Sequence, residues 1–185
     1  TYDNGEMRSF EKLDPIKKKK ECELLRRNNI AYLFQNFALV EKMTVEDNMK
    51  LAVKYNKAKN KKELIQTALD KMGVGDKLKS KVYELSGGEQ QRVAIARALL
   101  KEAEIYLLDD CLSAVDTDTE EKILTNLRDT LKGKTVIIVS HRVSITKYAD
   151  KILMLDKGKL VEQGTKDELL AQNGVFKAFY DTQTI

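Results

Sequence analysis

The sequence is short of the residues that build metal clusters, disulfide frameworks and membrane spans. Its 185 residues include one histidine, one proline, two cysteines and no tryptophan. Two cysteines, Cys22 and Cys111, cannot form a disulfide framework and favour a reducing compartment, and no zinc cluster is present. No apolar run approaches the about 18 residues that a membrane-spanning helix needs. No signal peptide is expected from this sequence.

The sequence also lacks a large excess of either sign of charge. The net charge is +4, with 42% hydrophobic and 34% charged residues, which is typical of one globular domain with a real core. Such a small excess does not by itself indicate nucleic-acid binding. The basic residues gather at Lys17–Lys20 and Lys57–Lys62. These clusters are either a solvated surface or a contact for anionic headgroups or an acidic partner.

What the sequence does contain is an alternation of apolar strands and amphipathic helices. Strands are expected at Ile30–Phe34, Ile105–Leu108, Thr135–Val139, Ile152–Leu155 and Leu160–Gln163. Helices are expected at Pro15–Arg27, after Thr44, at Lys61–Met72, from Ser86 to about Leu100, after Asp116, at Ser144–Tyr148 and after Thr165. This alternation predicts an α/β fold whose strands complete one mostly parallel sheet. The two wholly apolar strands predict helices on both faces of that sheet.

One helix start carries a further signal. Ser86-Gly87-Gly88-Glu89 fits a capping box, with Ser86 at the N-cap and Glu89 at the third helical position. The free N–H groups of a helix N-terminus and its positive potential form an anion site.

Polar residues follow three of the strands. Gln35, Asp109, Asp110 and His141 come at or just after the carboxyl ends, where the chemistry of such sheets is found. One carboxylate there can hold Mg²⁺, and a second can orient or deprotonate a water. A histidine one strand away can contact a transferring phosphoryl group. Together these groups predict a phosphoryl-transfer site.

The same segments carry a family resemblance. LSGGEQQR at Leu85–Arg92 resembles the signature motif of the ATP-binding cassette (ABC) family. EIYLLDD at Glu104–Asp110 resembles its Walker B strand, and SAVD at Ser113–Asp116 resembles its D-loop. Gln35 is placed like the Q-loop glutamine and His141 like the switch histidine. The resemblance runs from about residue 30 to the end of the chain.

The resemblance implies a P-loop NTPase-like fold and a role for each strand-end residue. Asp109 would organise Mg²⁺, and Asp110 stands where the family usually has its catalytic glutamate. Gln35 would reach both metal and water, and His141 would contact the γ-phosphate.

The resemblance also implies a composite site between two cassettes. Ser86, Gly87 and Gly88, with Glu89 in the same motif, would bind the ATP held by the opposite subunit. Asp116 would lie at the interface between the two cassettes.

Three departures from the family pattern qualify these roles. No stretch matches the G-x-x-x-x-G-K-[ST] phosphate loop, Walker A, so the chain is expected to be an N-terminally truncated cassette. Asp110 is one methylene shorter than glutamate, which changes its reach toward a water. The first half resembles free-standing cassettes of the lipoprotein, macrolide or bacteriocin export type, whereas the second resembles cassettes fused to a membrane domain.

The resulting hypothesis is an ABC-type ATPase domain that powers export of a peptide, bacteriocin, lipid or drug-like substrate. ATP and Mg²⁺ are its expected cofactors. Residues of about 36–100 would form a helical signature subdomain with the Q-loop, and residues 1–35 and 101–185 part of the RecA-like core with the C-terminal helices. A second cassette and a transmembrane domain would be its partners, at the cytoplasmic face of the membrane, with no nucleic acid expected.

Three alternatives stay open at this point. The chain could be a degenerate regulatory cassette in an asymmetric dimer. It could be an inactive fragment, because Walker A is missing. It could also be a cassette relative that serves DNA repair or translation without a membrane partner.

Overall fold

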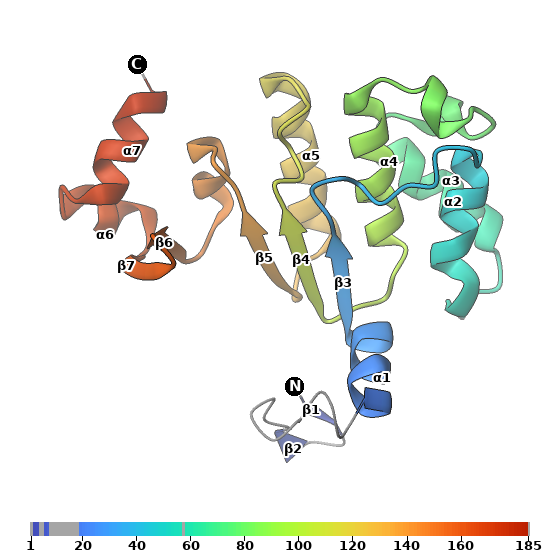
Figure 1. Cartoon of the computed structure of the whole chain (residues 1–185), viewed down its shortest axis with the longest axis horizontal. Coiled ribbons are helices and arrows are strands. Elements are labelled where there is room, and N and C mark those ends of the chain that lie inside the picture. Colours follow the sequence, from blue (N-terminus) through green and yellow to red (C-terminus); the bar gives the residue numbers. More distant parts are fainter. Residues whose placement is uncertain (1, 4–5, 8–18, 57, 185) are drawn as a thin grey trace.

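A short parallel sheet forms the centre of the molecule (Figure 1). The computed structural model describes residues 2–3, 6–7, 19–56 and 58–184. Strands β3 (Ile30–Leu33), β4 (Ile105–Asp109) and β5 (Thr135–Val139) pair in the order β3-β4-β5, and both pairings are parallel. The helical crossovers that parallel strands require follow β3 and β4. The predicted α/β class and mostly parallel sheet with flanking helices are confirmed.

The remaining elements alternate with this sheet and follow it. A two-residue antiparallel pair, β1 (Tyr2–Asp3) with β2 (Glu6–Met7), lies near the N-terminus. The α-helices are α1 (Lys19–Asn29), α2 (Val45–Ala52), α3 (Lys61–Lys71), α4 (Gly87–Leu99), α5 (Thr117–Thr130), α6 (Lys166–Ala171) and α7 (Val175–Gln183). The 3₁₀ turns are η2 (Val53–Tyr55), η3 (Gly75–Lys77), η4 (Val82–Glu84) and η5 (Val143–Tyr148). Among the described residues, no helix combines the length and apolar character needed to cross a bilayer.

The main core lies between one face of the sheet and helices α4 and α5. Side chains of β3 and β4 alternate, so that Ala31, Leu33, Tyr106 and Leu108 are buried while their neighbours are more exposed. Small and branched residues of α4 pack against them, and α5 adds three apolar residues from its inner face. These helix residues are Val93, Ala94, Ile95, Ala96, Ile123, Leu124 and Leu127. The alanines of α4 allow the helix to approach the sheet closely.

The opposite face of β5 corrects the expectation that helices cover both sides. On that face Ile137 and Val139 are 51% and 54% exposed, and Val136, on the face toward the core, is 37% exposed. In the part of the chain that the structure describes, this strand is therefore open to solvent. An apolar run shows that a strand can be buried, but it does not show which of its faces has a partner.

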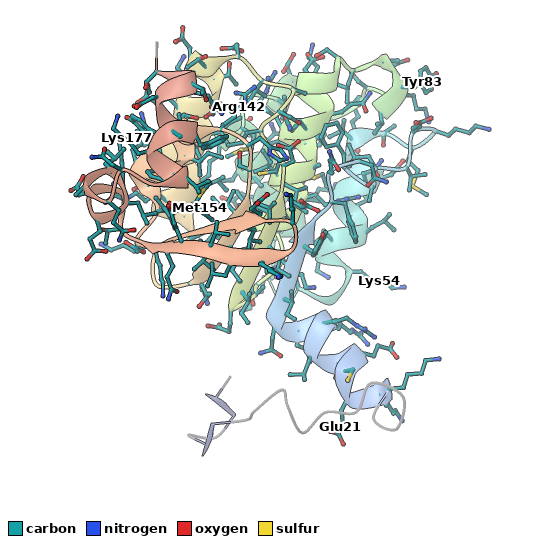
Figure 2. The ribbon with its side chains drawn as sticks, turned by 60° about the vertical axis from the view of Figure 1, so that its left-hand side comes forward. Glu21, Lys54, Tyr83, Arg142, Met154 and Lys177 are labelled. Atoms are coloured by element: carbon teal, nitrogen blue, oxygen red, sulfur yellow. The ribbon has the colours of Figure 1, made fainter. Side chains whose placement is uncertain are left out.

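The last two strands correct the expectation of one continuous sheet. β6 (Ile152–Asp156) and β7 (Lys159–Gly164) form a separate antiparallel hairpin. Lys157 and Gly158 at its turn both have positive φ, +47° and +75°, which suits a tight two-residue hairpin. The hairpin packs against α6 and α7 around Leu169 and Phe176, and Figure 2 labels Met154 on this small unit.

The helical predictions agree more closely with the structure. Thr44 caps α2 by accepting the Asp47 N–H at 3.1 Å, as expected. Helix α3 lies within one residue of its predicted end. The predicted start of the first helix, at Pro15, lies outside the described residues, and α1 extends to Asn29, two residues beyond the prediction. Helices α2 and α3 pack beside α4 at one side of the sheet (Figure 1).

Two leucines of the α2–α3 region offer a matched test of this packing. Leu69 of α3 is fully buried, whereas Leu51 of α2 is 51% exposed. Leu69→Ala should lower the free energy of unfolding by about 2–5 kcal/mol, since it leaves a cavity. Leu51→Ala should change it by less than about 0.5 kcal/mol. Urea denaturation measures both values, and equal losses would contradict the packing described for α3.

Candidate active site

Parallel pairing aligns the ends of the three central strands. Leu33 pairs with Leu108, and Asp109 pairs with Val139. The backbone positions of Gln35, Asp109, Asp110 and His141 therefore lie at or just after the ends of three adjacent strands, with Asp109 the last residue of the middle strand and Asp110 directly after it. This is the placement that the strand ends predicted, whereas the chemical roles of the four residues stay predictions.

Asp109 has a partner that the sequence did not reveal. The hydroxyl of Tyr32 on β3 donates a hydrogen bond to Asp109 Oδ2 at 3.1 Å. This bond and the negative charge of Asp109 raise the pKa of Tyr32, because ionisation would remove the donor and add a second negative charge. Tyr32 also packs against Phe34, with ring centroids 4.2 Å apart. The neighbouring strand therefore orients the Asp109 carboxylate.

Asp110 leaves the strand in an unusual backbone conformation. Its φ is +43°, in the left-handed region that few residues other than glycine adopt. The Asp110 N–H still donates to the carbonyl of Val139 at 2.9 Å. The Asp110 carbonyl accepts from the Ser113 hydroxyl at 3.1 Å. The chain thus turns sharply at Asp110, which places its side chain at the start of a loop and not in the ladder.

Gln35 lies in a tight turn that a distant arginine holds. The turn has positive φ at Phe37 and Ala38, 62° and 47°. Arg97 of α4 donates to both of their carbonyls, each at 2.7 Å. Burial lowers the pKa of Arg97. Helix α4 therefore fixes the course of the chain that follows Gln35, and the Gln35 residue itself is exposed.

The start of α4 is the predicted capping box. Ser86 Oγ accepts the Glu89 N–H at 3.3 Å, and Glu89 Oε2 accepts the Ser86 N–H at 2.8 Å. These bonds to Ser86, and Lys77 nearby, lower the pKa of Glu89. The structure thus places the Glu89 carboxylate on the cap itself. Gly87 and Gly88 provide the first two helical N–H groups, where an anion would be favoured.

A loop of residues 111–116, between β4 and α5, connects the strand-end edge with the start of α4. The Ala114 N–H donates to Gln91 Oε1 of α4 at 3.2 Å. A Cβ added at Gly88 would meet the Ala114 carbonyl oxygen at 3.1 Å, so the loop and the helix start are in close contact. Asp116 ends this loop and caps α5 by accepting the Thr119 N–H at 2.9 Å. Hydrogen bonding with the side chain of Thr119, and then with its backbone N–H, lowers the pKa of Asp116.

His141 is exposed, and the C-terminal helix holds its backbone. Gln183 of α7 donates through Nε2 to the His141 carbonyl at 2.7 Å. The same side chain accepts the Val143 N–H at 3.1 Å. Sequence reasoning did not predict this contact, because the partners are about forty residues apart and follow no periodic pattern.

The donor set of the edge fits a hard divalent cation. Asp109, Asp110 and Gln35 offer carboxylate and amide oxygens, and Mg²⁺ is usually held by one or two carboxylates together with substrate phosphates. Within residues 2–3, 6–7, 19–56 and 58–184, no three His, Cys, Asp or Glu side chains form a metal cluster. A site of the edge's composition would therefore depend on the substrate for part of its coordination.

Comparison with known proteins shows which family the sequence matches. Residues 2–113, more than half of the chain, match the family model described as ABC transporter. A probable multidrug resistance ABC transporter ATP-binding/permease protein, YheI of Bacillus subtilis, is 50% identical over 101 residues, which are 55% of this chain. An ATP-dependent lipid A-core flippase of Pseudomonas fluorescens is 51% identical over 92 residues, 50% of this chain. The chain's matched part spans only 17% and 15% of these two relatives.

Solved structures match over a larger share of the chain. A bacterial Atm1-family ABC exporter with ATP bound is 30% identical with a TM-score of 0.74, covering 84% of this chain and 29% of the exporter. The dimeric bacterial ABC transporter cassette MJ0796 is 29% identical with a TM-score of 0.74, covering 84% of this chain and 69% of the cassette.

The two glycines of the capping box give a prediction about the loop contact. A Cβ at Gly87 meets nothing within 4 Å, whereas one at Gly88 meets Ala114. Gly87→Ala should raise the free energy of unfolding by up to about 1 kcal/mol, since alanine favours helix. Gly88→Ala should give no such gain, because the loop must shift. Urea denaturation of both variants checks this, and an equal gain in both would contradict the close contact.

The contact between Tyr32 and Asp109 predicts a coupled titration. Asp109→Asn removes the negative charge that opposes ionisation, so the pKa of Tyr32 should fall toward its ordinary value. NMR of ¹³Cζ-labelled tyrosine over alkaline pH measures it, with Tyr32→Phe assigning the signal. An unchanged Tyr32 pKa in Asp109→Asn would show that the two side chains do not interact in solution.

Proposed function

The chain belongs to the ABC transporter family, and we propose that it is part of a nucleotide-binding domain that powers export across a membrane. The observation that carries the proposal is a close contact between the start of α4 and the loop that follows β4. The serine–glycine start of α4 touches the loop that leaves the carboxylate edge of the sheet. Relatives named as an exporter and a flippase support the direction of transport.

We assign the strand-end residues to hydrolysis of ATP. Asp109, oriented by Tyr32, would hold Mg²⁺, which supplies neutralisation of phosphate charge when bound. Asp110 would orient and deprotonate the attacking water, and Gln35 would accept from that water or ligate the metal. His141 would donate to the γ-phosphate as its charge develops.

The helix start would serve a second cassette. Ser86, Gly87 and Gly88 supply the hydroxyl and the first N–H groups of α4, and Glu89 holds Ser86 in the cap by accepting from its N–H and its hydroxyl. We propose that they bind the γ-phosphate of ATP held by the partner, with Asp116 at the interface. The known dimeric structures of the MJ0796 cassette, one of them with ADP and Pi, support this arrangement.

Partners and location follow from the same proposal. The cassette would act with a transmembrane domain, as the ATP-binding/permease name of the Bacillus relative suggests. It would lie at the cytoplasmic face of the membrane. Residues of about 36–100, with α2, α3 and α4, would form the helical signature subdomain, and the remainder would belong to the RecA-like core.

A non-hydrolysing cassette is the second candidate, and Asp110 is the observation that favours it. Its carboxylate is one methylene shorter than glutamate and begins from a left-handed backbone. A water placed for a longer side chain would lie beyond its best reach, and a displacement of about 1 Å can lower a rate strongly. Such a cassette would bind nucleotide while its partner hydrolyses it.

The proposal that the cassette hydrolyses ATP predicts that substitutions of its site residues reduce turnover in the complete protein. Asp110→Asn and His141→Ala should each lower kcat for ATP by about 100-fold or more, since each removes a group that acts in the transition state. Asp129→Asn, an exposed acid of α5, is the control and should keep the rate. Phosphate release measures kcat. Unchanged rates in both site variants, or no hydrolysis by the unmodified protein, would refute the assignment.

Asp110→Glu separates the two candidates. A large rise in turnover of the complete homodimer would show that aspartate limits the site and would favour the degenerate cassette. An unchanged rate of ATP hydrolysis would show that Asp110 already positions its water, which favours the hydrolysing cassette. Phosphate release at saturating ATP and Mg²⁺ gives the comparison.

A further inference from the structure

Arg142, the residue after His141, sits in a cluster that the proposed function does not use. We propose that Arg142 is a positioning residue that holds the loop of residues 111–116 against the backbone beside His141. It thereby fixes where Asp116 lies relative to His141. The proposal rests on the proposed function, which gives those two residues their roles. Arg142 is labelled in Figure 2.

The guanidinium of Arg142 contacts three groups, one on α5 and two in the loop. Nη1 pairs with the carboxylate of Glu120 on α5. Nη2 donates to the carbonyl of Ser113 at 3.1 Å and to that of Val115 at 3.2 Å. A planar guanidinium offers its donors in a fixed fork, so these contacts set an orientation as well as a charge pair. Arg142 thus holds the loop through the backbone carbonyls of the loop.

Glu120, a buried residue of α5, binds the segment that follows His141. It is 2% exposed, and Oε2 pairs with Arg142 while Oε1 accepts from the hydroxyl of Ser144. A buried carboxylate needs such partners, because leaving it unpaired is strongly unfavourable. Both partners come from the three residues after His141. The Glu120 N–H also donates to the Asp116 carbonyl at 2.8 Å, which joins this pair to the helix cap.

The other side of the loop faces the start of α4. Gln91, which is fully buried, accepts the Ala114 N–H at 3.2 Å, and Gly88 lies against the Ala114 carbonyl. The loop is therefore held between the helix that starts at Ser86 and the arginine that follows His141. A displacement of the backbone at residue 142 would move the carbonyls of Ser113 and Val115, and Asp116 with them.

The substitution Arg142→Lys separates a positioning role of Arg142 from simple neutralisation of the Glu120 charge. The single ammonium nitrogen of lysine can pair with Glu120, but lysine has no second nitrogen in a fixed plane to donate to the two loop carbonyls, as Nη2 of Arg142 does. If Arg142 only neutralises a buried acid, Arg142→Lys should behave like the unmodified chain. If it positions the loop, Arg142→Lys should keep most of the stability and release the loop.

Cys111 reports the position of the loop. It begins the loop, is 2% exposed, and burial raises the pKa of its thiol to about 12. In a Cys22→Ser background of the full chain it is the only thiol, so its rate of labelling by a disulfide reagent measures loop opening. We expect Arg142→Lys and Arg142→Ala to label about tenfold faster than the parent. The urea midpoint of Arg142→Lys should stay close to the parent value.

Lys147→Ala is the matched control. Lys147 forms an exposed pair with Glu121, which joins the same two elements, η5 and α5, without touching the loop. It should leave the labelling rate unchanged. Labelling of Arg142→Lys at the parent rate, or equal acceleration by Lys147→Ala, would overturn the proposal. If Arg142→Ala fails to fold, Arg142→Lys decides the result alone.

Turnover in the complete protein gives a second readout. Arg142→Lys should lower kcat for ATP by about tenfold with little change in KM, because positioning acts on the reacting geometry. Lys147→Ala should change neither value. Full turnover in Arg142→Lys would overturn the positioning role. An inactive unmodified protein would refute the proposed function alone, since the labelling rates decide the loop contact independently.

Discussion

The parallel pairing of β4 with both of its neighbours is the interaction on which the candidate site depends. It aligns Asp109 with Val139 and brings the segments after three strands to one edge. The Asp110 N–H adds one more bond to Val139 before the chain turns. A slip of one residue would move every side chain of β4 to the other face, so that Tyr106 and Leu108 would leave the core. The same register of β4 is therefore required both for core packing and for placing the carboxylates.

The features that the sequence predicted well depend on residues that are close together along the chain. The cap at Ser86 and the helix starts after Thr165 and Asp116 depend on side chains within one helical turn, and the structure confirms each of them. The strands were found because their apolar runs are bounded by polar residues. The open face of β5 and the separate β6–β7 hairpin were missed, because both depend on which elements meet in space.

The contacts that orient the site are long-range, which explains why they left no sequence pattern. Tyr32 and Asp109 are 77 residues apart, and Arg97 reaches carbonyls 59 and 60 residues away. Glu120 could have been noticed, because it shares the inner face of α5 with Ile123 and Leu124. An acid on an apolar helix face needs a buried partner. The sequence alone could not show that this partner follows His141.

The left-handed backbone at Asp110 puts two opposing demands on one position. Aspartate is among the few non-glycine residues that adopt this conformation readily, because its short side chain can bond locally. Glutamate would extend farther toward a water but has no such conformational advantage. The turn at the end of β4 thus favours a short acid, while reach into the site favours a long one. If Asp110 acts as proposed, the geometry of a turn and the length of a side chain would jointly decide whether a chain of this kind hydrolyses nucleotide or only holds it.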